Sequence, residues 1–270
     1  NCAVARCGDG YVRDGVEQCD DGNANDDDAC RNDCVSGLCG NSEIDDGETC
    51  DDGDNDNWNL CPNDCQFAKP VISAGGNHMC LVKEGKVFCA GQARYGALGN
   101  NDLENDQKII VEVDNLTNVV GLTSGYYHQC ALRDDGSVWC WGENTYGQVG
   151  DGTRDNRAQP VRVSGLTDVE EISAAYRNTC ARRVNGEVWC WGYGGYGSLG
   201  NSSHSTRETP QRVTGIHNAV EIGGGIYHYC ARVADGSVWC WGRGGYGESS
   251  NDADLLSNYS SPIQVRGFSD

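Results

Sequence analysis

The chain has 270 residues, a formal net charge of -20, 38 glycines and 17 cysteines. A negative charge of this size repels phosphate groups, which argues against nucleic acid as a partner. No apolar run approaches the ~20 residues that a membrane-spanning helix needs, so we expect no membrane span. Cysteines in this number, mostly at paired spacings, are typical of an oxidising compartment and predict an extracellular or cell-surface protein.

Residues 1–69 differ from the rest of the chain, because they hold 18 Asp and Glu against 4 Lys and Arg. Apolar residues are too few for an ordinary core, so we expect a small, disulfide-rich, loop-dominated region held by cross-links or metal. Its cysteines form two copies of one pattern, Cys7, Cys19, Cys30 and Cys34 followed by Cys39, Cys50, Cys61 and Cys65. Cys2 fits the end of an earlier copy, with an unpaired thiol as the alternative.

Oxygen-bearing side chains recur at every second position in both copies. The candidate metal ligands are Glu17, Asp21, Asn23, Asn25 and Asp28 in the first copy and Glu48, Asp52, Asp54 and Asp56 in the second. Calcium takes six to eight oxygen ligands, and a tight loop of alternating Asp and Asn brings three of them to one point. The sequence therefore predicts a Ca²⁺ cofactor. Two alternatives remain: the acids form a solvated surface, or zinc binds the cysteines.

Residues 70–270 contain four repeats of about 50 residues, which we place at 70–118, 119–168, 169–218 and 219–270. Each repeat predicts a strand, a hairpin with two cysteines, a glycine-rich turn and a further strand, which is the length of one four-stranded propeller blade. We expect an all-β fold of propeller-type blades, as a whole or a partial propeller. One disulfide is expected in each hairpin: Cys80–Cys89, Cys130–Cys140, Cys180–Cys190 and Cys230–Cys240.

The second hairpin shows why these blades must pack together. A three-residue loop at 134–136 places Cys130 and Cys140 opposite each other on antiparallel strands, about 4.5–5.5 Å apart at Cα. Trp139 and Trp141 then share the other face of the hairpin. Because both faces are apolar, each needs another sheet against it. This predicts core tryptophans between blades, with a sugar-stacking platform as the alternative.

The repeats share a motif that runs from His or Asn through Cys-Ala-Leu, Asp-Gly-x-Val-Trp-Cys-Trp-Gly and Tyr-Gly-x-Leu-Gly to Pro-x-x-Val. Over about residues 71–270 this motif resembles the repeat of the regulator-of-chromosome-condensation propeller family, in a secreted bacterial form with paired cysteines. The resemblance implies a β-propeller, usually of seven blades, whereas this chain has four repeats. Residues 19–23 and 50–54 resemble the cysteine-rich Asp-Asp-Gly-Asn repeats of myxobacterial and related bacterial surface proteins.

A histidine recurs two positions before the first cysteine, as His78, His128 and His228, but Asn178 takes this position in the third repeat. A ring of metal ligands tolerates Asn poorly, so we interpret these residues as hydrogen-bonding groups inside a blade. No serine lies in a nucleophile-elbow context, and we predict no enzyme activity. The glycine-turn tyrosines can reach the surface and are the predicted partner-binding residues: Tyr95, Tyr146, Tyr196 and Tyr246.

Two functions of different class fit these features. In the first, the protein is a calcium-stabilised, non-catalytic binding module whose propeller loops recognise a protein or a cell-surface glycan. In the second, it is a structural subunit of an extracellular filament, sheath or surface assembly. Four blades that do not close leave apolar faces at both ends, and these faces must meet another chain. The oligomeric state separates the two functions.

Overall fold

A computed structural model describes residues 71–244 and 257–265 of the chain. The chain divides into two compact units, Asn1–Pro70 and Val71–Asp270, and all described residues belong to the second unit. Strands dominate the described residues, and their helical content is two short 3₁₀ turns, η1 (Arg94–Gly96) and η2 (Gly195–Gly197). The predicted all-β class is therefore confirmed.

The strands form four separate four-stranded antiparallel sheets, which are the blades. Blade 1 contains β1 (Ile72–Ala74), β2 (His78–Lys83), β3 (Lys86–Gly91) and β4 (Gln107–Glu112). Blade 2 contains β5 (Val119–Ser124), β6 (His128–Arg133), β7 (Val138–Gly142) and β8 (Arg157–Arg162). Blade 3 contains β9 (Val169–Ala174), β10 (Asn178–Arg183), β11 (Val188–Gly192) and β12 (Arg207–Arg212). Blade 4 contains β13 (Ala219–Gly224), β14 (His228–Val233), β15 (Val238–Gly242) and β16 (Tyr259–Gln264).

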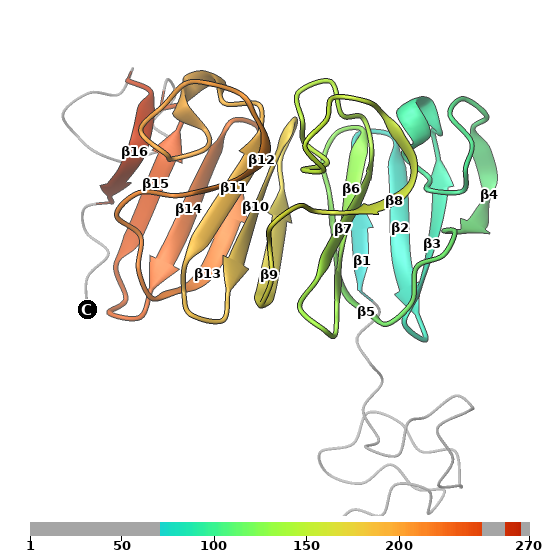
Figure 1. Ribbon diagram of the computed structural model, residues 1–270, viewed down its shortest axis with the longest axis horizontal. Helices are drawn as coiled ribbons and strands as arrows, with labels where there is room; N and C mark the ends of the chain where they lie inside the picture. Colours follow the sequence, from blue (N-terminus) through green and yellow to red (C-terminus); the bar gives the residue numbers. More distant parts are fainter. Residues whose placement is uncertain (1–70, 245–256, 266–270) are drawn as a thin grey trace, which may run out of the picture. The chain divides into compact units, whose positions relative to one another are not determined.

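The blades follow one another in chain order, with blade 1 and blade 4 at opposite ends of the row (Figure 1). Within each blade the strands pair in sequence order, so the fourth strand forms one edge of the sheet. The first strands of successive blades contact each other. The arrangement is that of consecutive propeller blades.

The central hairpins have the predicted register, with Cys130 opposite Cys140 and Leu132 opposite Val138. Gly136 closes the three-residue loop with a φ of 73°, in the left-handed region that glycine adopts without strain. The four expected disulfides are present, with Cα–Cα distances of 4.0–4.1 Å: Cys80–Cys89, Cys130–Cys140, Cys180–Cys190 and Cys230–Cys240.

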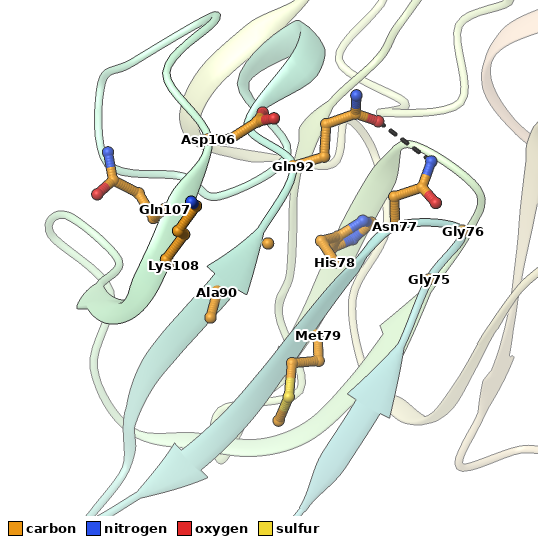
Figure 2. Close-up of a pocket in the computed structure, with 11 residues that line it drawn as sticks. Gly75, Gly76, Asn77, His78, Met79, Ala90, Gln92, Asp106, Gln107 and Lys108 are labelled. Carbon is orange, nitrogen blue, oxygen red and sulfur yellow. Dashed lines mark hydrogen bonds between the residues drawn. The ribbon is translucent and has the colours of Figure 1, made fainter.

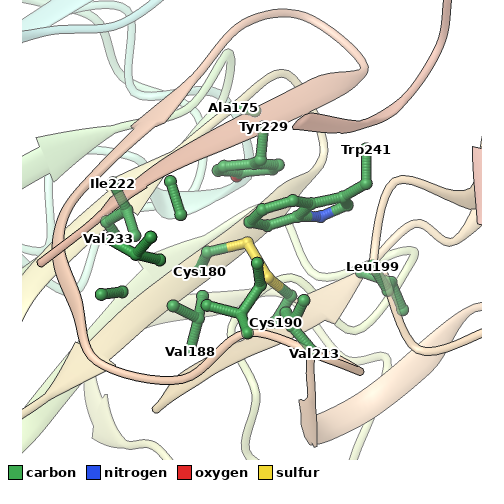
Figure 3. Close-up of a cluster of buried hydrophobic side chains, with 13 residues drawn as sticks. Ala175, Cys180, Val188, Cys190, Leu199, Val213, Ile222, Tyr229, Val233 and Trp241 are labelled. Atoms are coloured by element: carbon green, nitrogen blue, oxygen red, sulfur yellow. A yellow bond between two sulfur atoms is a disulfide. The ribbon is translucent and has the colours of Figure 1, made fainter. Parts of the chain in front are cut away.

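Each blade has two faces, and successive blades pack by opposite faces. We call the face that carries the disulfide the trailing face, and the face that carries the tryptophans the leading face. The trailing face of one blade packs against the leading face of the next, so that the Cys180–Cys190 disulfide lies against Tyr229 and Trp241 (Figure 3). Burying such an aromatic side chain contributes about 4–6 kcal/mol as an upper estimate. The predicted core role of the tryptophans is confirmed.

Buried polar groups also make contacts that recur from one junction to the next. His78 Nε2 lies 3.2 Å from Gln129 Oε1, and His128 Nε2 lies 2.9 Å from Thr179 Oγ1. The predicted hydrogen-bonding role is therefore confirmed for His78 and His128, and each of the two bonds crosses to the next blade. Burial lowers the pKa of His78 and lowers the pKa of His128 to about 3. Both rings are therefore neutral at pH 7.

Candidate binding surface

Two sets of turns meet at one end of the blades. One set joins the first and second strands of each blade, and the other set, the glycine-rich turns, follows the third strand. A backbone hydrogen bond from Glu143 N to Tyr127 O, at 2.9 Å, ties the two sets together in blade 2. Neighbouring blades are joined in the same way, from Gly76 N to Tyr126 O at 3.1 Å and from Tyr126 N to Tyr176 O at 3.3 Å. The backbone of this end is therefore fixed by hydrogen bonds within and between blades.

The turns carry eight tyrosines whose rings form one connected network, which we call the tyrosine surface. Its members are Tyr95, Tyr126, Tyr127, Tyr146, Tyr176, Tyr193, Tyr196 and Tyr227. Neighbouring ring centroids lie 4.5–6.4 Å apart in edge or tilted orientations, each worth about 0.5–1.5 kcal/mol. Tyr126 and Tyr196 are exposed, and the adjoining Ile226 side chain is 63% exposed. The network is thus a rigid aromatic layer with apolar groups facing solvent.

Arginine side chains lie on the tyrosine rings. The Arg94 guanidinium is 4.7 Å from the centroid of Tyr95, and that of Arg177 is 4.8 Å from the centroids of both Tyr146 and Tyr176. Seven other arginines of the described residues pair with carboxylates: Arg133, Arg154, Arg157, Arg182, Arg183, Arg212 and Arg232. The chain as a whole is negatively charged, but the tyrosine surface carries positively charged guanidinium groups, which lie on its rings in cation–π contacts.

A buried carboxyl group lies close to these cations. Glu143 is 5% exposed, and one of its carboxyl oxygens has no hydrogen-bond partner in the described residues. Burial raises the pKa of Glu143, while the charges of Arg177 and Arg94 act in the opposite direction. The two guanidinium charges therefore favour the ionised form of the Glu143 carboxyl, which burial disfavours.

The sequence predicted only part of this surface. Of the four tyrosines proposed for binding, Tyr95, Tyr146 and Tyr196 belong to the network, and Tyr246 lies outside the described residues. The missed members come mostly from the turns between first and second strands: Tyr126, Tyr127, Tyr176 and Tyr227, with Tyr193 from a glycine turn. Aligning the repeats at the two positions before the recurring His or Asn would have found all but Tyr193.

The predicted calcium ligands fall outside the described residues: Glu17, Asp21, Asn23, Asn25, Asp28, Glu48, Asp52, Asp54 and Asp56. Within residues 71–244 and 257–265, no group of three or more His, Cys, Asp or Glu is arranged to hold a metal ion. In the same part of the chain, none of the helices has the length and apolar character needed to cross a membrane.

Two family models match the blades. One regulator of chromosome condensation (RCC1) repeat model matches residues 135–182 and 185–232, and a second matches 119–148, 169–198 and 219–248. The chain contains RCC1 repeats. Two curated relatives are similar to part of the chain: human E3 ubiquitin-protein ligase HERC2 is 36% identical over 95 residues, and the Arabidopsis thaliana ultraviolet-B receptor UVR8 is 34% identical over 95 residues. Each match covers 34% of this chain.

These matches span only part of the relatives' own lengths, 2% of HERC2 and 21% of UVR8. Among solved structures, human WBSCR16 superimposes with a TM-score of 0.64 at 21% identity, over 72% of this chain and 51% of that one. Prp20p from Saccharomyces cerevisiae superimposes with a TM-score of 0.63 at 20% identity, over 74% and 52%. These likenesses show the propeller fold, and this chain spans about half the length of the two solved chains.

Proposed function

We propose that this chain is a secreted or cell-surface, non-catalytic binding module that recognises a protein through its tyrosine surface. The observation that carries the proposal is the connected network of tyrosine rings with arginines held on their faces. Tyrosine and arginine dominate the residues that supply most of the binding energy in protein interfaces. The exposed Ile226 side chain adds an apolar contact beside them.

The rigidity of the surface supports the same function. Backbone hydrogen bonds and ring contacts order these side chains before any partner arrives, which lowers the entropy cost of binding. Prp20p, which shares the fold, binds Gsp1p and histones. This supports protein as the class of partner, and neither of those partners is carried over to this chain.

Two further parts of the proposal concern the setting of the module. The four hairpin disulfides support an oxidising compartment and hence an extracellular or cell-surface location. The alternating acids of residues 1–69 support Ca²⁺ as a stabilising cofactor of that region.

Affinity capture tests the proposal. The full chain is immobilised and exposed to the extracellular fraction of its source cells, beside a Tyr126→Ser/Arg177→Ser variant and a Val184→Ser control. Val184 is 67% exposed in the β10–β11 hairpin turn, at the other end of the strands from Tyr126. We expect a protein bound by the wild type and the control and lost from the double variant. Retention of the protein by the double variant would contradict the proposal. Loss of capture after glycosidase treatment of the fraction would show that the module recognises a glycan instead of a protein surface.

Self-assembly through open blade faces is the second candidate function. The observation in its favour is the exposure of apolar side chains on the leading face of blade 1, where Ile72 is 68% exposed. This candidate concerns the ends of the row of blades, whereas the tyrosine surface lies across the turns of blades 1 to 4.

A further inference from the structure

The turns that carry the tyrosine surface differ in charge from the rest of the chain. Asp and Glu make up 40 of the 270 residues, about one in seven. The described turns at this end of the blades are 75–77, 125–127, 175–177 and 225–227 between first and second strands, and 92–99, 143–150, 193–200 and 243–244 after the third strands. They contain one acid, the buried Glu143, and three arginines, Arg94, Arg177 and Arg243. The charge that these turns present to solvent is therefore positive.

The acids that follow the glycine turns are engaged in other contacts. They lie in the segments 100–106 and 151–156, which lead to the fourth strand, at the edge of the sheet away from the first strand. Asp151 pairs with Arg157, and Asp106 Oδ1 accepts a hydrogen bond from Ala93 N at 3.0 Å. These carboxylates form no ion pair with the arginines on the tyrosine rings.

Arg94 and Arg177 keep most of their hydrogen-bonding capacity. A guanidinium group has five N–H donors, and contact with the face of a ring uses none of them. Arg177 Nη1 donates to Tyr146 Oη at 3.1 Å, and the Arg94 side chain is exposed. Within residues 71–244 and 257–265, no carboxylate pairs with either group, whereas seven other arginines have such a partner. The remaining donors can bind a carboxylate of another molecule through two parallel hydrogen bonds.

A run of tyrosine rings links the two guanidinium groups. Arg94 lies 5.6 Å from the centroid of Tyr127, and the centroids of Tyr126 and Tyr176 follow at steps of 4.5 and 4.9 Å. Arg177 lies 4.8 Å from the last centroid, so the two charges are at most about 20 Å apart. An extended peptide spans about 3.3–3.6 Å per residue, so a segment of about six residues can reach both. The exposed ring of Tyr126 lies along this path.

We propose that the partner binds through an acidic peptide segment, in which two carboxylates pair with Arg94 and Arg177 and an apolar side chain lies on Tyr126. This inference rests on the proposed function and names the chemistry of its partner. The guanidinium groups select for carboxylates, because each leaves paired N–H donors at the surface. The tyrosine rings supply contact area that is already ordered.

The negative charge of the whole chain does not prevent this contact. Of the 20 excess negative charges, 14 lie in residues 1–69. At physiological ionic strength the screening length is about 8 Å, so the charges that touch the partner decide which segment binds. The acids elsewhere in the chain act mainly on the rate of association, which should rise with added salt if they repel the segment.

Glu143 supplies a test that depends on the sign of the partner's charge. Blade 1 carries Gln92 at the corresponding position, directly after the glycine that pairs with the recurring histidine. There Gln92 Oε1 accepts a hydrogen bond from Asn77 Nδ2 at 3.1 Å (Figure 2). Glutamine therefore fits this position of the fold. Glu143→Gln removes the negative charge beside Arg94 and Arg177, so an acidic segment should bind this variant more tightly and a basic segment more weakly.

Selection from a display library of short random peptides tests the proposal on the full chain at pH 8. We expect the bound peptides to be enriched in Asp and Glu, and their affinity to fall about tenfold in Arg94→Gln and in Arg177→Gln. Arg94→Lys should retain more affinity than Arg94→Gln, because it keeps the charge. Arg162→Gln is the matched control, since Arg162 is exposed and ends β8 opposite Trp139, near the hairpin turn at the other end of the strands.

The outcomes separate this inference from the proposed function. Neutral or basic peptides that bind the wild type and are lost from Tyr126→Ser would keep the tyrosine surface as a binding site and overturn the acidic segment. Acidic peptides whose affinity is unchanged in Tyr126→Ser and in both arginine variants would bind elsewhere and contradict both proposals. Weaker binding of acidic peptides to Glu143→Gln, or no selected peptide at all, would also overturn the inference. Circular dichroism confirms that each variant remains folded.

Discussion

The inner junctions and the open leading face of blade 1 hold equivalent strand positions in opposite environments. In the single chain, Tyr229 of blade 4 is fully buried under blade 3, whereas the equivalent Met79 of blade 1 is 43% exposed. Ile222 is buried, whereas the equivalent Ile72 is exposed. Both blades pair their strands in the same order and oppose the same two cysteines, although β1 pairs with β2 at three positions and β13 pairs with β14 at five. A blade therefore forms its own hydrogen-bonded sheet but depends on its neighbours for its core.

The largest expected difference between the two environments is in the free energy of unfolding that is lost when an aromatic side chain is removed. Trp191 is fully buried, and its Nε1 donates to Gln148 O at 2.9 Å. Trp191→Ala should cost about 3–5 kcal/mol, because it leaves a cavity and an unsatisfied carbonyl. Phe88→Ala, on the open leading face of blade 1, should lower the free energy of unfolding by less than half as much, because Phe88 is only half-buried. Urea unfolding followed by circular dichroism measures both, and equal losses would refute the dependence on neighbours.

The disulfides offer a comparison with the loop length held constant. Cys180–Cys190 and Cys230–Cys240 both join residues ten apart, so chain entropy contributes equally to each, slightly under 3 kcal/mol. The inner pair is covered by blade 4, while Cys230 is half-buried at the end of the row. Replacing both inner cysteines by alanine should therefore cost more than replacing the outer two. The difference between the unfolding midpoints of the two variants measures how much packing against the next blade contributes to stability. Equal midpoints would show that this packing contributes nothing at the disulfide.

A buried histidine makes the inner junctions sensitive to acid. The folded pKa of His128 is about 3, below the unfolded value of about 6.5, so the unfolded chain binds more protons as the pH falls. Stability from this group is fully present above pH ~6.5 and is lost progressively toward pH ~3, with a loss of about 2 kcal/mol by pH ~5. His128→Asn introduces the residue that blade 3 carries at Asn178. The variant should flatten the slope of unfolding free energy against pH, and an unchanged slope would contradict this assignment.

The hairpins could be predicted from the sequence because their geometry is local. Centring the loop on Asp135 placed Cys130 opposite Cys140, and the two-residue period of a strand then placed the tryptophans on the opposite face. That the tryptophans are buried followed from the need to cover two apolar faces. The repeat spacing gave the number of blades for the same reason, since each repeat closes its own sheet.

The features that depend on contacts between blades could not be predicted in the same way. The tyrosine surface joins Tyr126, Tyr176 and Tyr227, which lie about 50 residues apart and meet only when the blades stack. The hydrogen-bonding role of His128 was predicted, but its partner Thr179 was not, because the sequence does not show which face of a blade meets which neighbour. A hollow of about 950 Å³ beside Ala90, on the leading face of blade 1, had no signal until the other leading faces supplied the comparison.

The smallest expected effect is that of calcium, which should stabilise residues 1–69 and leave the stability of the blades unchanged. In the described blades, disulfides and packing hold the fold, and no group there is arranged to bind a metal ion. Calcium at about 1 mM with a dissociation constant near 10⁻⁴ M would stabilise its own region by about 1.4 kcal/mol. We expect calorimetric binding heat that Asp21→Asn/Asp52→Asn reduces, while chelator leaves the melting of the blades unchanged. Calcium-dependent melting of the blades would instead mean that the two regions share one cooperative unit, and absence of binding heat would leave the acids as a solvated surface.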